Sequence, residues 1–188
     1  LSLFLTQHVL VTKLFPMQKA NTPNAILFEV YPDQKEEIIA LMNSMELPVL
    51  QDVSIVNMKL AAIKGVPVSE LRRNRGQARV KGRGRRRTPG WVTGRQYRST
   101  YRDHLEDSEE LIAGELHGPF TGGIDDVIPV SVEKDIADDM GVILGDELGW
   151  DVQGMLIKTR VTSLRKVDWR RVQPNFFVVF PTGALEEA

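Results

Sequence analysis

A hairpin signal near the carboxyl end limits the folds open to this chain more than any other feature. In ELGWDVQGMLIKTRVTSLRKV, two runs rich in apolar and β-branched residues flank Gln153-Gly154. A two-residue connection that contains Gly is a common way to join antiparallel strands. A later apolar run, NFFVVFP, predicts a fully buried strand. The last part of the chain is therefore expected to build a sheet.

The first part of the chain has the pattern of a β-α unit. NTPNAILFEVYP predicts a strand of about six residues, entered and left through Pro. The following run, DQKEEIIALMNSMELP, predicts a helix that Pro48 ends. Asp33 and Glu36 have the spacing of a capping box at its start. Its apolar face consists of Ile38, Leu41, Met42 and Met45.

The middle of the chain adds further strands and a short helix. VLQDVSIVNMKLAAIKGVPV predicts a long strand that ends in a Lys-Gly turn, with Val56, Met58 and Leu60 on one side. QYRSTYR alternates aromatic and polar residues, as an exposed edge strand does, and ELIAGEL predicts a short apolar element. IPVSVEKDIADDMG predicts a strand and then a helix that is capped by Ser131 and ended by Gly141. The fold class is therefore α+β with strand in excess.

A basic stretch interrupts this pattern. Residues 72–87 hold nine Lys or Arg and no acidic residue, and the rest of the chain then carries a net charge of -10. Affinity for nucleic acid depends on neutralising phosphates, so one basic loop on an acidic body gives weak, salt-sensitive binding. Residues 72–90 are also rich in Gly and have no apolar period. We expect a solvated, mobile surface loop, with a polyanion- or nucleic-acid-binding arm at 72–87 as the alternative.

Known catalytic and metal-binding patterns are not found in the sequence. His8, His104 and His117 do not have the spacing of a metal site, and the chain has no Cys. Asp103 and His104 lie near Ser and Thr residues, but the sequence lacks the G-x-S-x-G turn of a hydrolase. Neither a phosphate-binding loop nor a calcium-binding loop has its full motif. We therefore expect no enzyme activity, no catalytic, cofactor-binding or metal-binding residues, and no cofactor.

The amino-terminal run LSLFLTQHVLVTKLF leaves three interpretations open. It is apolar over about fifteen residues, short of the roughly twenty that cross a bilayer. It could form a buried amphipathic helix, an interfacial helix, or the outer end of a membrane helix, and periodicity slightly favours the first. Because the sequence starts at Leu1 and stops just after an apolar strand, we also expect it to be a piece of a longer polypeptide.

A family resemblance is carried mainly by the run from Thr159 to Ala188. Its parts are the strand pattern at Val161 to Arg165, VDW at Val167 to Trp169, and PNFFVVFP at Pro174 to Pro181. PNAILFEVYPDQ, KLAAIKGVPV and VSVEKDIADDMGVILGDEL follow the same family order upstream. The chain resembles the extracytoplasmic, periplasmic core domain of FtsX-like and MacB-like ABC transporter permeases, and in particular the YbbP-type subgroup.

This resemblance implies a specific architecture. Residues 1–20 would be the end of a membrane helix and a stalk, which is the third interpretation of the amino-terminal run. Residues 21–188 would be an extracytoplasmic α+β domain, in which a membrane-proximal β-α-β lobe carries an inserted β-rich lobe. The basic stretch departs from the family pattern, so the resemblance gives its arginines no role.

The resemblance also implies a place and partners. The domain would face the periplasm or the cell exterior at a bacterial inner (plasma) membrane. Its expected partners are an ABC ATPase subunit, reached through the membrane part of the permease, and a second permease copy, with no nucleic acid. The permease would couple ATP hydrolysis by that separate subunit to the movement or export of a lipid, lipoprotein or other ligand.

Overall fold

The computed structural model describes residues 25–78, 88–123, 125–171 and 173–186. The chain divides between Asp52 and Val53 into two compact units. Residues 1–20, for which the end of a membrane helix is predicted, lie outside the described part. Among the described residues, no helix combines the length and the hydropathy that a bilayer span requires.

The first unit contains the predicted helix but not the predicted strand. Helix α2 spans Pro32–Ser44, and none of its residues is buried. Residues 25–31 form no strand, and Glu29 has a φ of 60°, which interrupts an extended run. An isolated strand has no hydrogen-bonding partner, so β propensity alone does not form one. In the described residues, the expected β-α unit therefore consists of its helix alone.

The cap of α2 also differs from the prediction. Asp33 lies inside the first turn, and the cap position is Tyr31. The backbone N–H of Tyr31 donates to Gln34 Oε1 at 3.4 Å, so Gln34 takes the place that was predicted for Glu36. The helix starts two residues earlier than the Asp signal indicated because Pro32 fits the first helical position.

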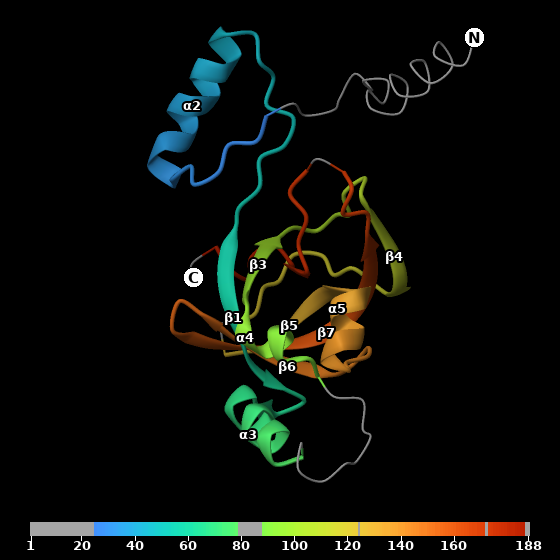
Figure 1. Ribbon diagram of the computed structural model, residues 1–188. Coiled ribbons are helices and arrows are strands. Elements are labelled where there is room, and N and C mark those ends of the chain that lie inside the picture. Colours follow the sequence, from blue (N-terminus) through green and yellow to red (C-terminus); the bar gives the residue numbers. More distant parts are fainter. Residues whose placement is uncertain (1–24, 79–87, 124, 172, 187–188) are drawn as a thin grey trace, which may run out of the picture. The chain divides into compact units, whose positions relative to one another are not determined.

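The second unit holds the strands (Figure 1). Its strands are β1 (Val56–Ile63), β2 (Val66–Pro67), β3 (Gln96–Tyr101), β4 (Glu109–Gly114), β5 (Ile128–Glu133), β6 (Glu147–Val152), β7 (Met155–Val167) and β8 (Val178–Phe180). Its helices are α3 (Val68–Ala78), α4 (Gly90–Gly94) and α5 (Lys134–Met140).

The strands of this unit close into a barrel. β1 pairs with β3, β3 with β8, β8 with β5, β5 with β7, β7 with β6, and β6 returns to β1. β2 and β4 extend the ring at β1 and β7. Closure removes most of the free strand edges that an open sheet exposes. The result is a mixed α/β unit with a barrel-like sheet. The expected inserted β-rich lobe resembles this unit only because both are rich in strands.

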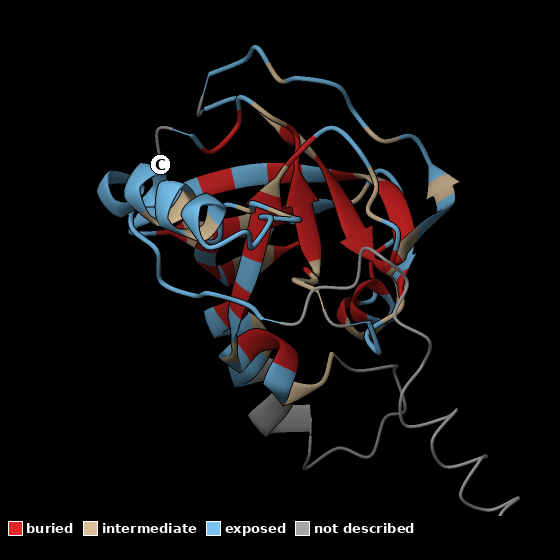
Figure 2. Cartoon of the chain, turned by 90° about the horizontal axis from the view of Figure 1, so that it is seen from above, coloured by how far each residue is buried: buried red, intermediate tan, exposed pale blue. Residues whose placement is uncertain are grey.

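Alternating side chains of the strands fill the barrel. Val56, Met58 and Leu60 of β1 are buried, as their spacing predicts. Trp150 of β6 is fully buried, and its indole N–H donates to Thr159 Oγ1 at 3.0 Å. Buried residues follow the inner faces of the strands throughout the ring (Figure 2). The apolar pattern in the sequence therefore specifies the inside of the barrel.

Two predicted turns are confirmed. Gln153 and Gly154, between β6 and β7, have φ values of 52° and 94°. Lys64 and Gly65, between β1 and β2, have φ values of 51° and 75°. Positive φ at both central residues is the geometry of the tight hairpin turn whose twist matches that of the strands. Local turn chemistry therefore sets the register of both hairpins.

The prediction of an exposed edge strand at Gln96–Tyr101 is wrong. β3 lies between β1, to which it is antiparallel, and β8, to which it is parallel. Tyr97 and Ser99 are fully buried, and the Ser99 hydroxyl donates to the carbonyl of Val178 at 2.8 Å. Gln96 and Arg98 point to the exposed outer face of the barrel, while Tyr97 and Ser99 face its core. An exposed edge strand would have the same alternating sequence pattern.

The short helix after β5 has a different cap from the one predicted. Ser131 lies within β5, and the carboxylate of Glu133 accepts from the Ile136 N–H at 2.9 Å as the N-cap of α5. The end at Gly141 is confirmed, since this residue has a φ of 70° in the left-handed region. Helix α5 lies beside β5 and β7 (Figure 1).

The loop expected at 72–90 is partly helical. α3 continues through Ala78, and α4 begins at Gly90, while residues 79–87 lie outside the described part of the chain. Arg72 donates through Nη2 to the carbonyl of Thr93, which ties α3 to α4. The composition of residues 72–90 alone predicts a loop, because it does not reveal that Arg72 has a carbonyl partner further along the chain.

Candidate functional site

Three charged side chains form a buried ion cluster, defined here as Arg102, Glu109 and Arg165. Glu109 accepts from Arg165 Nη1 at 2.6 Å through Oε1 and from Arg102 Nη2 at 2.5 Å through Oε2. The exposed fractions of these side chains are 0% for Arg165, 1% for Glu109 and 7% for Arg102. Both carboxylate oxygens are therefore used, and the pairs are shielded from water.

The fold places the buried ion cluster where three strands approach one another. Glu109 is the first residue of β4, Arg165 lies on the paired strand β7, and Arg102 directly follows β3. Arg165 also donates through Nη2 to the carbonyl of Phe176 at 2.7 Å, in the segment that leads into β8. The cluster thus ties the loop before β4 to the wall of the barrel.

Burial strongly affects the charge on Arg165. Burial lowers the pKa of its guanidinium to about 10. The negative charges of Glu109 and Glu133 oppose this shift, and the positive charge of Arg102 adds to it. Glu133 is the cross-strand partner of Arg165 on β5. The guanidinium therefore stays charged at neutral pH, balanced by carboxylates on either side. This arrangement holds elements together and leaves no carboxylate oxygen of Glu109 free for chemistry.

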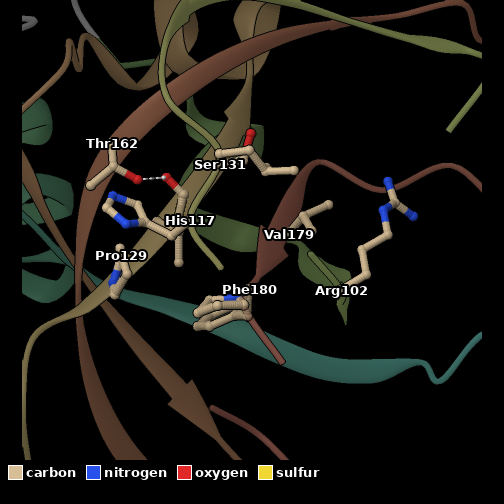
Figure 3. Close-up of a pocket in the computed structure, with 10 residues that line it drawn as sticks. Arg102, His117, Pro129, Ser131, Thr162, Val179 and Phe180 are labelled. Carbon is tan, nitrogen blue, oxygen red and sulfur yellow. Dashed lines mark hydrogen bonds between the residues drawn. The ribbon is translucent and has the colours of Figure 1, made fainter. Parts of the chain in front are cut away.

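Arg102 of the buried ion cluster also lines a small cavity (Figure 3). Its volume is about 10 Å³, roughly the space of one water molecule. Arg102, His117, Ser131 and Thr162 are among its lining residues, and the Thr162 hydroxyl donates to the carbonyl of Val130 at 3.2 Å. The Ser131 hydroxyl is buried and has no partner in the described residues. A cavity of this size suits a structural water and is too small for an organic substrate.

A larger groove lies on the outer side of β4 and β7. Its volume is about 490 Å³, within the usual range of ligand-binding clefts. The residues that line it are Ser108, Glu110, Lys166, Val167, Asp168, Trp169 and Arg170. This groove, called the Trp169 groove below, is the larger of the two hollows described and has room for a small molecule.

The carboxylate of Asp146 holds the connection between α5 and β6. Asp146 Oδ2 accepts from the Ile143 N–H at 2.8 Å and forms an ion pair with Lys64 Nζ at 2.8 Å. Burial alone raises the pKa of Asp146, but the hydrogen bonds from Lys64 and Ile143 outweigh burial and hold that pKa below its usual value. The carboxylate therefore stays ionised and orders the entry into β6.

The histidines and the Asp103-His104 pair form no catalytic arrangement in the described residues. His104 Nδ1 lies 3.1 Å from Asp103 Oδ1, and both side chains are more than half exposed. His117 lies at the small cavity, and His8 is outside the described residues. No group of three or more His, Asp or Glu in the described ranges suits a metal ion.

The sequence did not single out the residues of the buried ion cluster, although one signal was present. Val161, Ser163 and Arg165 alternate along β7, and all are buried. A charged residue at an inward position of a strand requires a buried partner of opposite charge. The partner, Glu109, is 56 residues away along the chain and could not be identified from spacing.

Comparison with known proteins relates part of this chain to a transporter. The chain is 44% identical over 57 residues to a protein of Escherichia coli (strain K12) described as "Uncharacterized ABC transporter permease YbbP". The match covers 30% of this chain and 7% of that protein's length. No family model and no solved structure matches the chain. The ABC permease part of the expected resemblance is therefore supported, and the FtsX-like, MacB-like and YbbP-type assignments stay predictions.

Proposed function

We propose that this chain is the extracytoplasmic domain of an FtsX-like, MacB-like ABC transporter permease of the YbbP-type subgroup. The observation that carries the proposal is the 44% identity over 57 residues to an ABC transporter permease. The domain faces the periplasm or the cell exterior at a bacterial inner membrane. It couples ATP hydrolysis by a separate ATPase subunit to the movement or export of a lipid, lipoprotein or other ligand.

The barrel supports a mechanical role for this domain. A closed ring of paired strands with a buried ion cluster at one wall resists internal deformation. A rigid body can pass on a displacement that reaches it from membrane helices, as domains do in hinge and shear motions. In this proposal the domain performs no bond chemistry, needs no cofactor, and acts through its surfaces. A second copy of the permease would complete the transporter.

Co-isolation from membranes tests the proposal. The full-length polypeptide that contains this chain is tagged, extracted from membranes with mild detergent, and analysed by mass spectrometry. We expect an ABC ATPase to be recovered with it in near-equal amount, because in this proposal a separate subunit hydrolyses the ATP. The extraction is carried out at low salt and again at about 0.5 M salt, because the higher salt removes proteins that are held only by exposed charges.

Two results would contradict the proposal. One is recovery of the full-length polypeptide in the soluble fraction without an ATPase. The other is co-isolation chiefly with nucleic acid that high salt releases, which would instead favour a role for the basic stretch at 72–87.

A further inference from the structure

One wall of the Trp169 groove carries two charged side chains that do not belong to the buried ion cluster. Glu110 of β4 and Lys166 of β7 are cross-strand partners in register. In the described residues, neither side chain forms a hydrogen bond or an ion pair with the protein. Both side chains line the groove and are exposed. A carboxylate acceptor and an ammonium donor are therefore free to bind a ligand there.

One residue that lines the groove carries a supported aromatic ring. Trp169 is 45% exposed, yet its ring packs against Phe177 with the centroids 4.7 Å apart and the planes tilted by 39°. Phe177 in turn lies under the guanidinium of Arg95 at 4.4 Å and meets the ring edge of Tyr97 at 6.1 Å. This stack holds the indole in place before any ligand arrives, which reduces the entropy lost on binding.

The charges of the groove exclude a strongly charged ligand. Two carboxylates, of Glu110 and Asp168, and two cations, of Lys166 and Arg170, line it, so their formal charges cancel. Asp168 and Arg170 already form an ion pair at 2.9 Å, and Glu110 and Lys166 are neighbours. The two signs are thus interspersed, so neither a polyanion nor a polycation meets a patch of one opposite sign.

We propose that the Trp169 groove binds the ring of a neutral carbohydrate. The C–H face of a sugar ring stacks on an aromatic platform, and its hydroxyls both donate and accept hydrogen bonds. Trp169 supplies the platform, Glu110 and Asp168 accept, and Lys166 and Arg170 donate. The inference depends on the groove alone and stands whether or not the proposed transporter role holds.

Binding of neutral trisaccharides to the 188-residue chain tests this inference. Maltotriose, cellotriose and chitotriose are each titrated, and binding is followed by saturation-transfer NMR on the sugar and by tryptophan fluorescence. We expect at least one of them to bind. Trp169→Ala should weaken that binding by about tenfold or more, since truncating an aromatic anchor removes the main contact. Glu110→Gln together with Lys166→Gln should weaken it by roughly threefold to tenfold.

A matched control separates groove binding from general damage. Leu156 is a 75% exposed apolar residue of β7, the strand that also carries Lys166, but it does not line the groove. Leu156→Ala should therefore leave the affinity unchanged, and circular dichroism of all variants checks that they are folded. The inference is overturned when none of the three sugars binds the folded chain, or when Trp169→Ala binds as well as the unaltered chain. Displacement of the sugar by millimolar phosphate or phosphocholine would also overturn it, because either result would assign the groove to a phosphate-bearing ligand instead.

Discussion

Glu109→Ala is expected to lower the free energy of unfolding by about 3–5 kcal/mol, the range for breaking a buried ion pair by removing one partner. Glu109 is 1% exposed and binds both Arg102 and Arg165. Without it, Arg165 keeps a charge inside the barrel wall, where the remaining carboxylate of Glu133 serves as the N-cap of α5. The loss arises mainly because both buried guanidiniums lose the carboxylate that they share. Arg165 keeps the carbonyl of Phe176 as a partner, but this group carries no full charge. Arg102 keeps the carbonyl of His104 and a longer ion pair with Glu106 at 3.8 Å.

Urea denaturation of the 188-residue chain, followed by far-UV circular dichroism, measures this effect. Glu147→Ala is the matched control, because Glu147 pairs with Arg160 at 2.8 Å while both side chains are about half exposed, at 48% and 51%. Exposed pairs contribute about 0–1 kcal/mol, so the control should change little. Equal losses in the two variants would show that the buried ion cluster does not hold the barrel together.

Trp150→Ala is expected to cost about 3–5 kcal/mol as well, through a cavity in the barrel core. Trp150 is fully buried, and its ring meets that of Tyr97 edge-on with the centroids 5.3 Å apart. The substitution also removes the donor to Thr159 Oγ1, although that hydroxyl keeps the carbonyl of Leu148 as an acceptor at 3.1 Å. The cavity is therefore the larger part of the effect.

Thermal unfolding and near-UV circular dichroism check this second effect. Trp91→Ala serves as the control, because it removes the same side chain from a site that is 48% exposed. We expect a change of at most about 1 kcal/mol from the loss of the Arg95 contact at 5.4 Å. A Trp150→Ala protein as stable as Trp91→Ala would mean that Trp150 is not packed in a closed core.

The parts of the fold that the sequence predicts correctly depend on local chemistry. The turns at Lys64-Gly65 and Gln153-Gly154 need positive φ, and Gly supplies it at one position of each. Gly141 ends α5 for the same reason. The inward side of β1 follows from alternation. Each of these features is determined within a few residues, which is the range that a single sequence describes well.

The closure of the barrel could not be predicted because it depends on distant pairings. β3 is an interior strand only because β8, about eighty residues later, lies parallel to it. An alternating run has the same pattern at an edge and in a barrel wall, because in both places one face of the strand packs on the core and the other faces solvent. The opposite error occurred at residues 25–31, where a strand-like run forms no strand. Both errors concern which partner a strand has.

The candidate site shows the same limit. Arg165 could be placed inward from the alternation of β7, but its partner Glu109 is 56 residues away along the chain and has no spacing signal. Trp169 enters the sequence analysis only as part of a family motif, and its place in the lining of the groove is supported by Phe177 and Arg95. Side chains brought together by the fold from separate segments cannot be identified from spacing alone.

Cysteine labelling in cells tests the central claim, that this domain lies outside the inner membrane. The chain has no Cys, so one can be added in the full-length polypeptide after any other Cys is replaced by Ser. Leu156→Cys lies beside the β6–β7 turn at a position that is 75% exposed, and Val161→Cys is the matched control at a fully buried one. The account predicts that a membrane-impermeant maleimide labels Leu156→Cys in cells with an intact inner membrane, and Val161→Cys only after denaturation. Labelling of Leu156→Cys only after the inner membrane is broken would contradict it.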